Sequence, residues 1–349
     1  MLLTAEAERR FICAIFAALD VSPAQQDAIA DVLTEADLRG YSSHGIVRVP
    51  LNVNLIRSGN VQREAHPTVI HDSGPALRID GDRAAGPYAA TVAAKQAIDR
   101  AQKHGVCAVG VSNCGHIGMA GYYVELAART DLVGLLFAKS ETFVHPYGGV
   151  EPLIGTNPIA IAIPSDPDPY LLDMSSSAIA AGKLREAQRA GRPLPMGVAV
   201  DAEGNPTTDP IAAGRGALSA AGGAKGYGLA LATELLGGLL VGGVVGDMKV
   251  RDGPRALWGC LIIVVDPACL TDLADFKRRA GAYVESVRGS RKAPGFGEIL
   301  IPGERSFRTR RARLAGGVPI ADDVWATVSE IARGLGIDPA AYVADAQGA

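Results

Sequence analysis

The chain has 349 residues, of which 48% are hydrophobic and 20% are charged, so its composition is that of a folded globular protein and excludes a disordered one. This length predicts two domains or one large one. The 34 basic and 37 acidic residues give a net charge of -3, so no basic excess indicates nucleic acid or a membrane surface as a partner.

Apolar residues recur at helical spacing from residue 4 to residue 39, which predicts two helices in this segment. Ser22 followed by Pro23 is typical of a helix start and places the second helix. The segment 58–73 that comes later is polar and rich in turn-forming residues.

The middle of the chain mixes strands with helices. A strand and a turn are predicted at 75–86, then an alanine-rich helix at 86–105 that Gly105 ends, and a further helix at 118–130. Short apolar runs of β type predict four more strands, at 106–112, 132–138, 157–164 and 169–175. This mixture is typical of the α/β or α+β class.

A segment rich in Gly, Pro and Thr lies at 204–228 and is predicted to be a long, functional loop. The apolar stretch 228–246 is interrupted by Glu234 and contains six glycines, which favours a buried helix with a following turn over a membrane span. Helices are predicted at 270–290 and 321–336.

These elements predict an α+β protein without membrane association. We expect a mainly helical domain built from both chain ends, at residues 1–75 and 210–349, and a central sheet-containing domain at 76–209. Five cysteines lack CxxC spacing and any metal-binding pattern with His, and the charged N-terminal segment does not resemble an export signal. Reduced thiols, a cytoplasmic location and no metal site are therefore expected.

Several common catalytic motifs are missing from the sequence. No GxGxxG follows a predicted strand, so the usual dinucleotide-binding fingerprint is absent. There is no GxxxxGK[ST], HExxH or GxSxG either, so kinase, metalloprotease and serine-hydrolase chemistry lacks motif support.

The stretch SSHGIVR, from Ser42 to Arg48, combines an imidazole with a guanidinium. If it is helical, His44 and Arg48 lie on one face, where a proton donor and an anion anchor would suit a 2-hydroxy or 2-keto acid. The alternative is a loop histidine beside a solvated arginine.

Other glycine-rich segments carry single polar residues. His116 lies between two glycines at a predicted helix entry, where it would meet a ligand or simply cap the helix. Lys225 lies among four glycines, as in a phosphate-binding turn or a flexible surface turn. Asp173, followed by three serines, would hold a ribose or cap a helix. The segment ILIPGE is expected to close a strand at Pro302.

Seven segments, in order from Ala36 to Glu304, together resemble the malate/L-lactate dehydrogenase family, whose members lack the Rossmann fold. This family includes sulfolactate, ureidoglycolate and diketogulonate oxidoreductases and cyclic-imine reductases. The matching segments are ADLRGYSSHGIVRVP, NCGHIGMAGYY, GGVEPLIGTNPIAIAIP, LLDMSSSAIAAGK, GNPTTDP, GGAKGYGLAL and GFGEILIPGE.

The resemblance implies a helical domain joined to a mixed-sheet NAD(P)-binding domain of non-Rossmann topology, in a homodimer that transfers hydride between NAD or NADP and a small 2-hydroxy/2-keto acid. It implies His44 or His116 as the proton-transfer group, with Ser43 and Arg48 binding the substrate. The residues implied to line the cofactor are Ser140, Thr156, Asn157, Asp173, Met174, Ser175, Lys225, Gly226, Pro302, Gly303 and Glu304.

The chain departs from its relatives where it has Lys139 and His145, since uncharged residues are common there. Our hypothesis is that one of them favours a second anionic group on the substrate, as in malate or sulfolactate; the alternative is a pairing with Glu141 or Glu151. A cyclic imino acid reductase and a catalytically silent nucleotide-binding relative remain as other functions. The choice between NAD and NADP stays open.

Overall fold

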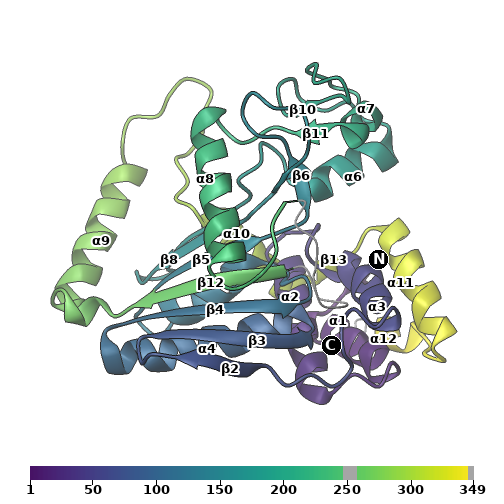
Figure 1. Ribbon diagram of the computed structural model, residues 1–349, viewed down its shortest axis with the longest axis horizontal. Coiled ribbons are helices and arrows are strands. Elements are labelled where there is room, and N and C mark those ends of the chain that lie inside the picture. The colour runs from purple at the N-terminus through teal and green to yellow at the C-terminus, as the bar shows by residue number, and fades with distance from the viewer. Residues whose placement is uncertain (247–257, 345–349) are drawn as a thin grey trace.

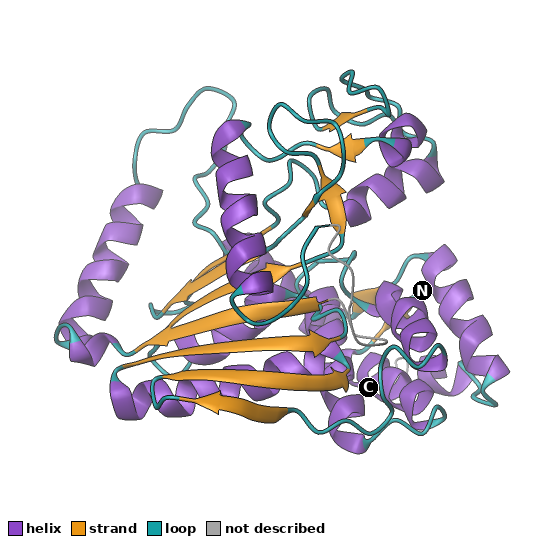
Figure 2. Ribbon diagram, in the orientation of Figure 1, coloured by secondary structure: helices purple, strands orange, loops and turns teal. Residues whose placement is uncertain are grey.

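The computed structural model describes residues 1–246 and 258–344 of the chain. A seven-stranded sheet forms its centre, with a helical unit beside one end of the strands and a smaller lobe above it (Figure 1, Figure 2). In spatial order the strands are β2 (Thr68–Asp72), β3 (Ala76–Ala84), β4 (Val106–Cys114), β12 (Trp258–Val265), β5 (Val133–Lys139), β8 (Ile159–Ile163) and β9 (Tyr170–Met174).

The central sheet is mixed and not of the Rossmann type. Only β3 and β4 pair in parallel, and every other pair in this sheet is antiparallel. The middle strands β4 and β12 are apolar on both faces, as strands covered from both sides must be. The α+β class and the non-Rossmann sheet expected from the sequence are therefore confirmed.

Helices cover both faces of this sheet. On one face lie α4 (Gly86–His104) and α5 (Ala120–Ala128), where α4 packs buried alanines against alternate residues of β4 such as Val109. On the other face, Gly110 of β4 meets Val241, which follows α8 (Ala224–Glu234) and its π-helical extension (Leu235–Leu239); a Cβ at Gly110 would lie 2.6 Å from Val241 Cγ1. Successive strand residues face opposite sides, so the two contacts belong to opposite faces.

The helical unit draws on both ends of the chain. It consists of α1 (Ala5–Ala17), α2 (Pro23–Leu38), the 3₁₀ turn η1 (Ile46–Arg48), α3 (Val49–Arg57), α11 (Asp322–Gly334) and α12 (Ala340–Ala344). Its ends are joined by β1 (Leu2–Leu3), which pairs with β13 (Val318–Pro319). In its core Phe11 packs against Trp325 and Tyr342, with ring centroids 5.3 and 5.0 Å away.

The smaller lobe has its own four-stranded sheet and its own core. In spatial order its strands are β10 (Ala199–Val200), β11 (Ala217–Leu218), β6 (Thr142–Val144) and β7 (Ile154–Gly155). Two helices, α6 (Ala181–Ala190) and α7 (Pro210–Arg215), complete the lobe. Val144, Leu184 and Leu218 form the centre of the core between them.

Three local predictions are wrong. The segment 204–228 is not one long loop, because it contains α7, β11 and the start of α8. The segment ILIPGE does not end a strand at Pro302. Instead it forms a turn that leads into α10 (Glu304–Gly316), a helix that was not predicted from the sequence. The polar segment 58–73 contains the edge strand β2, whose residues are all exposed.

The apolar stretch 228–246 forms a helix as predicted, but it is not fully buried. Leu229, Leu235 and Leu240 are 49%, 47% and 62% exposed. The helix α9 (Leu273–Arg288), preceded by the 3₁₀ turn η3 (Pro267–Cys269), likewise has no residue buried by the described part of the chain. Among the described residues, no helix combines the length and the apolar character needed to cross a membrane.

The division into a helical domain (1–75 and 210–349) and a central domain (76–209) stays a prediction. The seven-stranded sheet takes β2 and β12 from outside the segment 76–209, so the central fold extends beyond it. The small lobe has no counterpart in the predicted division.

Candidate active site

The segment that carries His44 and Arg48 is a turn and not a helix. Gly40, with a φ of 81°, ends the α2 region, and the 3₁₀ turn η1 begins only at Ile46. His44 and Arg48 therefore do not share a helical face. They converge in another way: Arg48 folds back and donates from Nε to the backbone oxygen of Ser43 at 2.6 Å.

The buried side chain of Asp37 stabilises this turn. Asp37 Oδ2 accepts a hydrogen bond of 2.6 Å from the backbone N–H of Ile46. Gly45 lies directly on the same carboxylate, so that a Cβ there would be 1.9 Å from Asp37 Cγ. Asp37 thus fixes the backbone on the C-terminal side of His44.

Two histidines from distant segments meet in this region. The rings of His44 and His116 are stacked, with centroids 5.8 Å apart and planes inclined by 28°. Ser43 Oγ lies 2.8 Å from His44 Nδ1. His116 Nδ1 accepts a hydrogen bond from the backbone N–H of Gly118, so the neutral ring carries its proton on Nε2. The edge of His116 also meets the ring of Trp258 at the start of β12.

Both imidazoles are neutral at pH 7 in the free protein. Burial, with the charge of Arg48 as a second cause, lowers the pKa of His44 to about 3. Burial also lowers the pKa of His116 well below its ordinary value, with contributions from Arg48 and His44. A neutral imidazole accepts a proton readily, and it becomes a proton donor when an anion beside it stabilises the charged form.

The smaller lobe also contacts the segment that carries His44 and Arg48. The first turn of α6 lies against Ser43, since a Cβ on Gly182 would be 2.6 Å from Ser43 Cβ. Arg185 follows Gly182 by three residues on this helix. Burial lowers the pKa of Arg48 to about 10, with the charge of Arg185 as the second cause and Glu141 acting in the opposite direction.

Arg185 was not among the site residues predicted from the sequence. Its helix is rich in charged residues, which is typical of a solvated surface. The one available signal was its position two residues after the family-like segment LLDMSSSAIAAGK, which ends at Lys183.

Four predicted cofactor residues form one hydrogen-bonded cluster at the sheet edge. Ser140 Oγ lies 3.0 Å from Thr156 Oγ1, and Ser175 Oγ donates to the backbone oxygen of Thr156 at 2.9 Å. The side chain of Asn157 accepts from Ser140 N and donates to Glu234 of α8. Residues from three separate turns and α8 are thereby joined in a polar wall.

The end of β9 joins this wall to the segment that carries His116. Asp173 Oδ2 accepts from the backbone N–H of Gly121, in the first turn of α5, at 2.7 Å. Of the two roles considered for Asp173, a helix cap is the one seen. Burial raises its pKa to about 6. Met174, at the end of β9, pairs with Ile159 of the neighbouring strand β8.

Lys225 and Gly226 lie in the first turn of α8, where Lys225 is exposed. The glycine turn before them begins beside the serine cluster, because Ala221 donates from its backbone N–H to the oxygen of Ser176 at 2.9 Å. Gly226 has no room for a side chain, since a Cβ there would lie 1.6 Å from the oxygen of Ala221.

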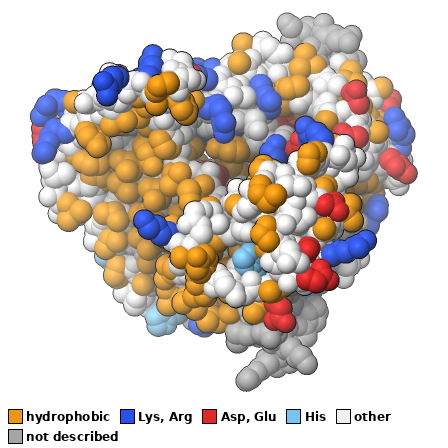
Figure 3. Space-filling view, turned by 90° about the horizontal axis from the view of Figure 1, so that it is seen from above, with side chains coloured by type: hydrophobic (Ala, Val, Ile, Leu, Met, Phe, Trp, Pro, Cys, Tyr) orange, Lys and Arg blue, Asp and Glu red, His pale blue; other side chains and the backbone are white. Residues whose placement is uncertain are grey.

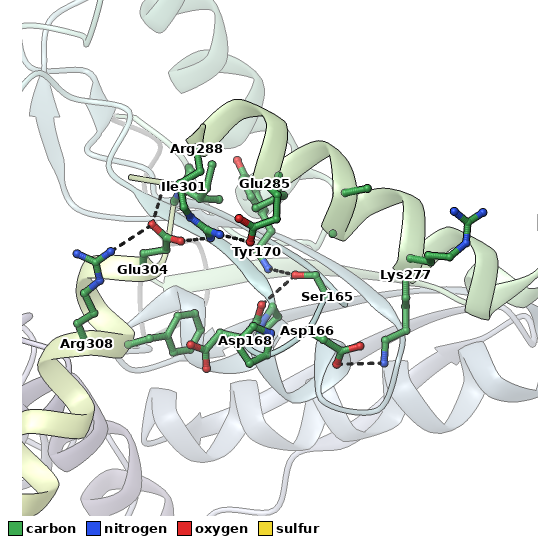
Figure 4. A pocket seen from close by; sticks show the side chains of 18 of the residues that line it. Ser165, Asp166, Asp168, Tyr170, Lys277, Glu285, Arg288, Ile301, Glu304 and Arg308 are labelled. Atoms are coloured by element: carbon green, nitrogen blue, oxygen red, sulfur yellow. Dashed lines mark hydrogen bonds and ion pairs between the residues drawn. The ribbon is translucent and has the colours of Figure 1, made fainter. Parts of the chain in front are cut away.

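A cavity of about 850 Å³ opens at the other end of β9, between α9 and α10 (Figure 4). Tyr170, Pro302 and Glu304 line it, and Gly303 caps α10 beside it. Glu304 accepts from the backbone N–H of Ile301 at 3.1 Å and pairs with arginines of α9 and α10. The walls carry both basic and acidic side chains, namely Lys277, Arg278, Arg288, Arg308 and Arg311 together with Asp166, Asp168, Glu285 and Glu304.

Lys139 and His145, which were predicted to bind the substrate, lie on two different parts of the fold. Burial lowers the pKa of Lys139 at the end of β5, while the nearby charges of Glu234 and Glu141 oppose this shift. His145 belongs to the small lobe, where its Nδ1 lies 2.8 Å from the oxygen of Pro146 and its Nε2 lies 3.2 Å from Ser219 Oγ. Both ring nitrogens of His145 are thus engaged away from the histidine pair.

Within residues 1–246 and 258–344, no group of three or more His, Cys, Asp or Glu side chains is arranged to hold a metal ion. The arrangement described above instead combines two neutral imidazoles, guanidinium groups and a hydroxyl-rich wall. It can bind an anion, accept or release a proton and support a polar cofactor.

Comparison with known proteins gives a consistent match. The chain matches the sequence model of the malate/L-lactate dehydrogenase family over residues 3–329. It is 37% identical to L-sulfolactate dehydrogenase of Methanothermobacter thermautotrophicus over 341 residues, which are 97% of this chain and 98% of the relative. It is 36% identical to malate dehydrogenase of Pyrococcus horikoshii over 337 residues, which are 94% of each chain.

Solved structures agree with this match. The sulfolactate dehydrogenase of Methanocaldococcus jannaschii superposes with a TM-score of 0.91 at 37% identity and covers 98% of this chain and 100% of its own. A delta1-piperideine-2-carboxylate reductase of Pseudomonas syringae superposes with a TM-score of 0.85 at 31% identity, covering 95% of this chain and 99% of its own.

Proposed function

The chain belongs to the malate/L-lactate dehydrogenase family and is therefore an oxidoreductase, and from this premise we propose that it transfers hydride between NAD or NADP and a small 2-hydroxy/2-keto acid. The observation that carries the proposal is the convergence of His44, His116 and Arg48 around Ser43. These groups supply the two functions that such a substrate needs, a place for its carboxylate and a partner for its hydroxyl proton.

Arg48 is suited to hold the carboxylate. Only its Nε is used within the described chain, in the bond to Ser43, so its two Nη groups remain to donate to a carboxylate. A guanidinium held at one end fixes the direction of its remaining donors. The 2-carbon of the acid is thereby oriented towards the histidine pair.

His44 and His116 are the candidates for proton transfer. In the oxidation of a hydroxy acid, a neutral imidazole takes the hydroxyl proton, and the low pKa of both rings keeps them neutral for this step. In the reverse direction, the bound carboxylate neutralises Arg48 and allows an imidazole to carry the proton that the keto oxygen receives. The nicotinamide cofactor, when bound, supplies or accepts the hydride.

The polar features along β9 fit a dinucleotide. The cluster of Ser140, Thr156, Asn157 and Ser175 lies at one end of this strand, and the cavity with charged walls lies at the other. The strand Tyr170–Met174 spans roughly 13 Å at about 3.3 Å per residue. We assign the hydroxyl cluster to the nicotinamide half and the cavity to the adenosine half. The cationic side chains of the cavity are each paired with a carboxylate, and a bound phosphate group would replace one of these carboxylates.

The proposal includes a homodimer, as the resemblance to the family implies. The leucines of α8 and its extension support it, because several large apolar side chains on one helix are exposed. Figure 3 shows hydrophobic side chains gathered over a broad part of the upper face of the molecule. A contiguous apolar surface of this kind is typical of an interface.

Leu235→Glu and Leu240→Glu should shift the molar mass measured by light scattering to that of one chain, whereas Met196→Glu in the small lobe should not.

One assay tests the activity directly. The protein is mixed with NADH or NADPH and a panel of 2-keto acids and cyclic imino acids, and the nicotinamide absorbance is followed. Turnover of keto acids supports the proposal. Turnover of the cyclic imino acids alone would identify the protein as a cyclic imino acid reductase. Binding of cofactor without any turnover would identify a silent relative and would contradict the proposal.

Variants assign the roles. His44→Ala and His116→Ala should lower kcat in at least one case by roughly 100-fold or more, as loss of a general acid–base does. Arg48→Ala should raise KM and lower kcat because orientation is lost. The matched controls are the exposed residues His66→Ala and Arg57→Ala, which should keep full activity. Normal kcat in both site-histidine variants would leave the reaction without its proposed acid.

A further inference from the structure

Arg185 reaches the substrate region from a lobe that carries none of the proposed catalytic groups. Gly182 of α6 touches Ser43, and residues three apart on a helix lie on the same face, so Arg185 faces the same side as this contact. Its guanidinium lies over the ring of Phe143, with 5.5 Å to the ring centroid. Glu141 Oε2 is 3.8 Å from its Nη2, a charge pair too long for a hydrogen bond.

Ser43 connects the two guanidinium groups. Its backbone oxygen accepts from Arg48, and its Cβ side faces the first turn of α6. The two groups are close enough for the charge of Arg185 to lower the pKa of Arg48. Like charges repel, so an anion that lies near both guanidinium groups stabilises the pair.

The described part of the chain supplies too little negative charge for this pair. Among the described residues, Glu141 is the carboxylate that acts on Arg48. One carboxylate balances only one of the two guanidinium charges, so a net charge of +1 remains on the group of Arg48, Arg185 and Glu141. Arg185 has no hydrogen-bond partner within residues 1–246 and 258–344, and Arg48 uses only Nε. The side chain of Arg185 is 49% exposed, so its guanidinium N–H donors are open to an anion that comes from outside the protein.

We propose that Arg185 is a specificity-determining residue that holds a second acidic group, so that the preferred substrate is a 2-hydroxy acid with two anionic groups, such as a dicarboxylate or a sulfonated carboxylate. This inference rests on the proposed function. Arg48 takes the carboxylate next to the reacting carbon, and Arg185 takes the distal carboxylate or sulfonate. A substrate with a single carboxylate leaves Arg185 without its anion.

This assignment replaces the sequence-based hypothesis for the second anionic group. His145 is engaged with Pro146 and Ser219, and within the described residues the charges of Glu234 and Glu141 act on Lys139. Arg185 differs from both in its position, because it lies on the face of α6 that meets Ser43. The requirement for positive charge stays, while the residue that supplies it changes.

The test compares malate with lactate in the wild type and in Arg185→Gln. The wild type should have a kcat/KM for malate at least about tenfold above that for lactate. Loss of a charge-assisted hydrogen bond predicts that Arg185→Gln lowers this ratio by roughly 10- to 100-fold, mainly through the KM for malate. Lys183→Gln, an exposed cation of the same helix paired with Glu186, is the control and should leave the ratio unchanged.

Two results would overturn the assignment while leaving the proposed function intact. One is a wild type that prefers lactate, and the other is an Arg185→Gln protein that loses both activities equally. If no hydroxy acid is oxidised with either cofactor, the proposed function fails, and calorimetry still decides on Arg185. Tartronate, a dianion, should then bind the wild type more tightly than oxamate does, and Arg185→Gln should weaken tartronate more than oxamate. Equal weakening, or none, would again overturn the assignment.

Discussion

Binding of an anionic inhibitor should draw a proton onto the pair His44 and His116. In the free protein, burial and the charge of Arg48 hold the pKa of His44 at about 3, and the pKa of His116 is also well below its usual range. A carboxylate on Arg48 cancels the guanidinium charge and adds an attractive one beside the rings. Both changes raise the pKa of an imidazole.

The size of the effect follows from these values. At pH 6, a group with a pKa of about 3 is protonated in roughly one molecule in a thousand. If the anion returns the pKa to the ordinary value of about 6.5, roughly three quarters of the complexes carry the proton. We therefore expect an uptake of about 0.7 proton per site at pH 6, about 0.2 at pH 7 and almost none at pH 8. The rings are 5.8 Å apart, so a second proton is disfavoured.

Isothermal calorimetry measures this number. Oxamate or tartronate is titrated into the protein, with and without NADH, in buffers of different ionisation enthalpy; the slope of observed enthalpy against ionisation enthalpy gives the protons taken up. The double variant His44→Gln with His116→Gln should show a slope near zero. A slope near zero in the wild type at pH 6, or an equal slope in the double variant, would refute the reasoning about the two rings.

Two further predictions concern the support of the site. Asp37→Ala removes the acceptor of the Ile46 N–H and the surface under Gly45, so the free energy of unfolding should fall by about 1–3 kcal/mol in urea titration and kcat should fall with it; an unchanged kcat would show that the turn does not need this anchor. Asn157→Ala leaves the buried carboxylate of Glu234 with one hydrogen-bond partner fewer, which should cost about 1–3 kcal/mol, measured as a lower Tm in scanning calorimetry. A loss below about 1 kcal/mol would mean that the region relaxes around Glu234.

The elements that the sequence predicted well are those in which one local pattern decides the structure. The helix α4 has alanines at helical spacing and a left-handed glycine at its end, and both features were visible. The strands β4, β5 and β8 are unbroken apolar runs, as strands covered on both faces must be. In these places propensity, pattern and tertiary packing agree.

Elements whose stability comes from distant partners were missed. The strand β11 has two residues and exists because Leu218 pairs with Val144, which is remote in the chain. β2 is an exposed edge strand without an apolar face. The turn at Pro302 packs on β9, where the backbone N–H of Leu171 donates to the backbone oxygen of Pro302. No local sequence pattern predicts this contact.

The same limit applies to the site. His44, His116 and Arg48 were chosen from their local segments and their resemblance to a family, and the structure brings them together. Their neighbour Arg185 could not be found in this way, because its contact with the site runs through Gly182 and Ser43, which only the fold brings together. The expectation that His44 and Arg48 share a helical face was wrong because the carboxylate of Asp37 holds the chain in a turn.

A crystal structure of the protein with NADH and tartronate tests the central claim most directly. One carboxylate should accept hydrogen bonds from both Nη groups of Arg48, and the hydroxyl oxygen should lie within about 3 Å of Nε2 of His44 or His116. An inhibitor bound beside the nicotinamide ring but out of reach of Arg48 and both histidines would contradict the account.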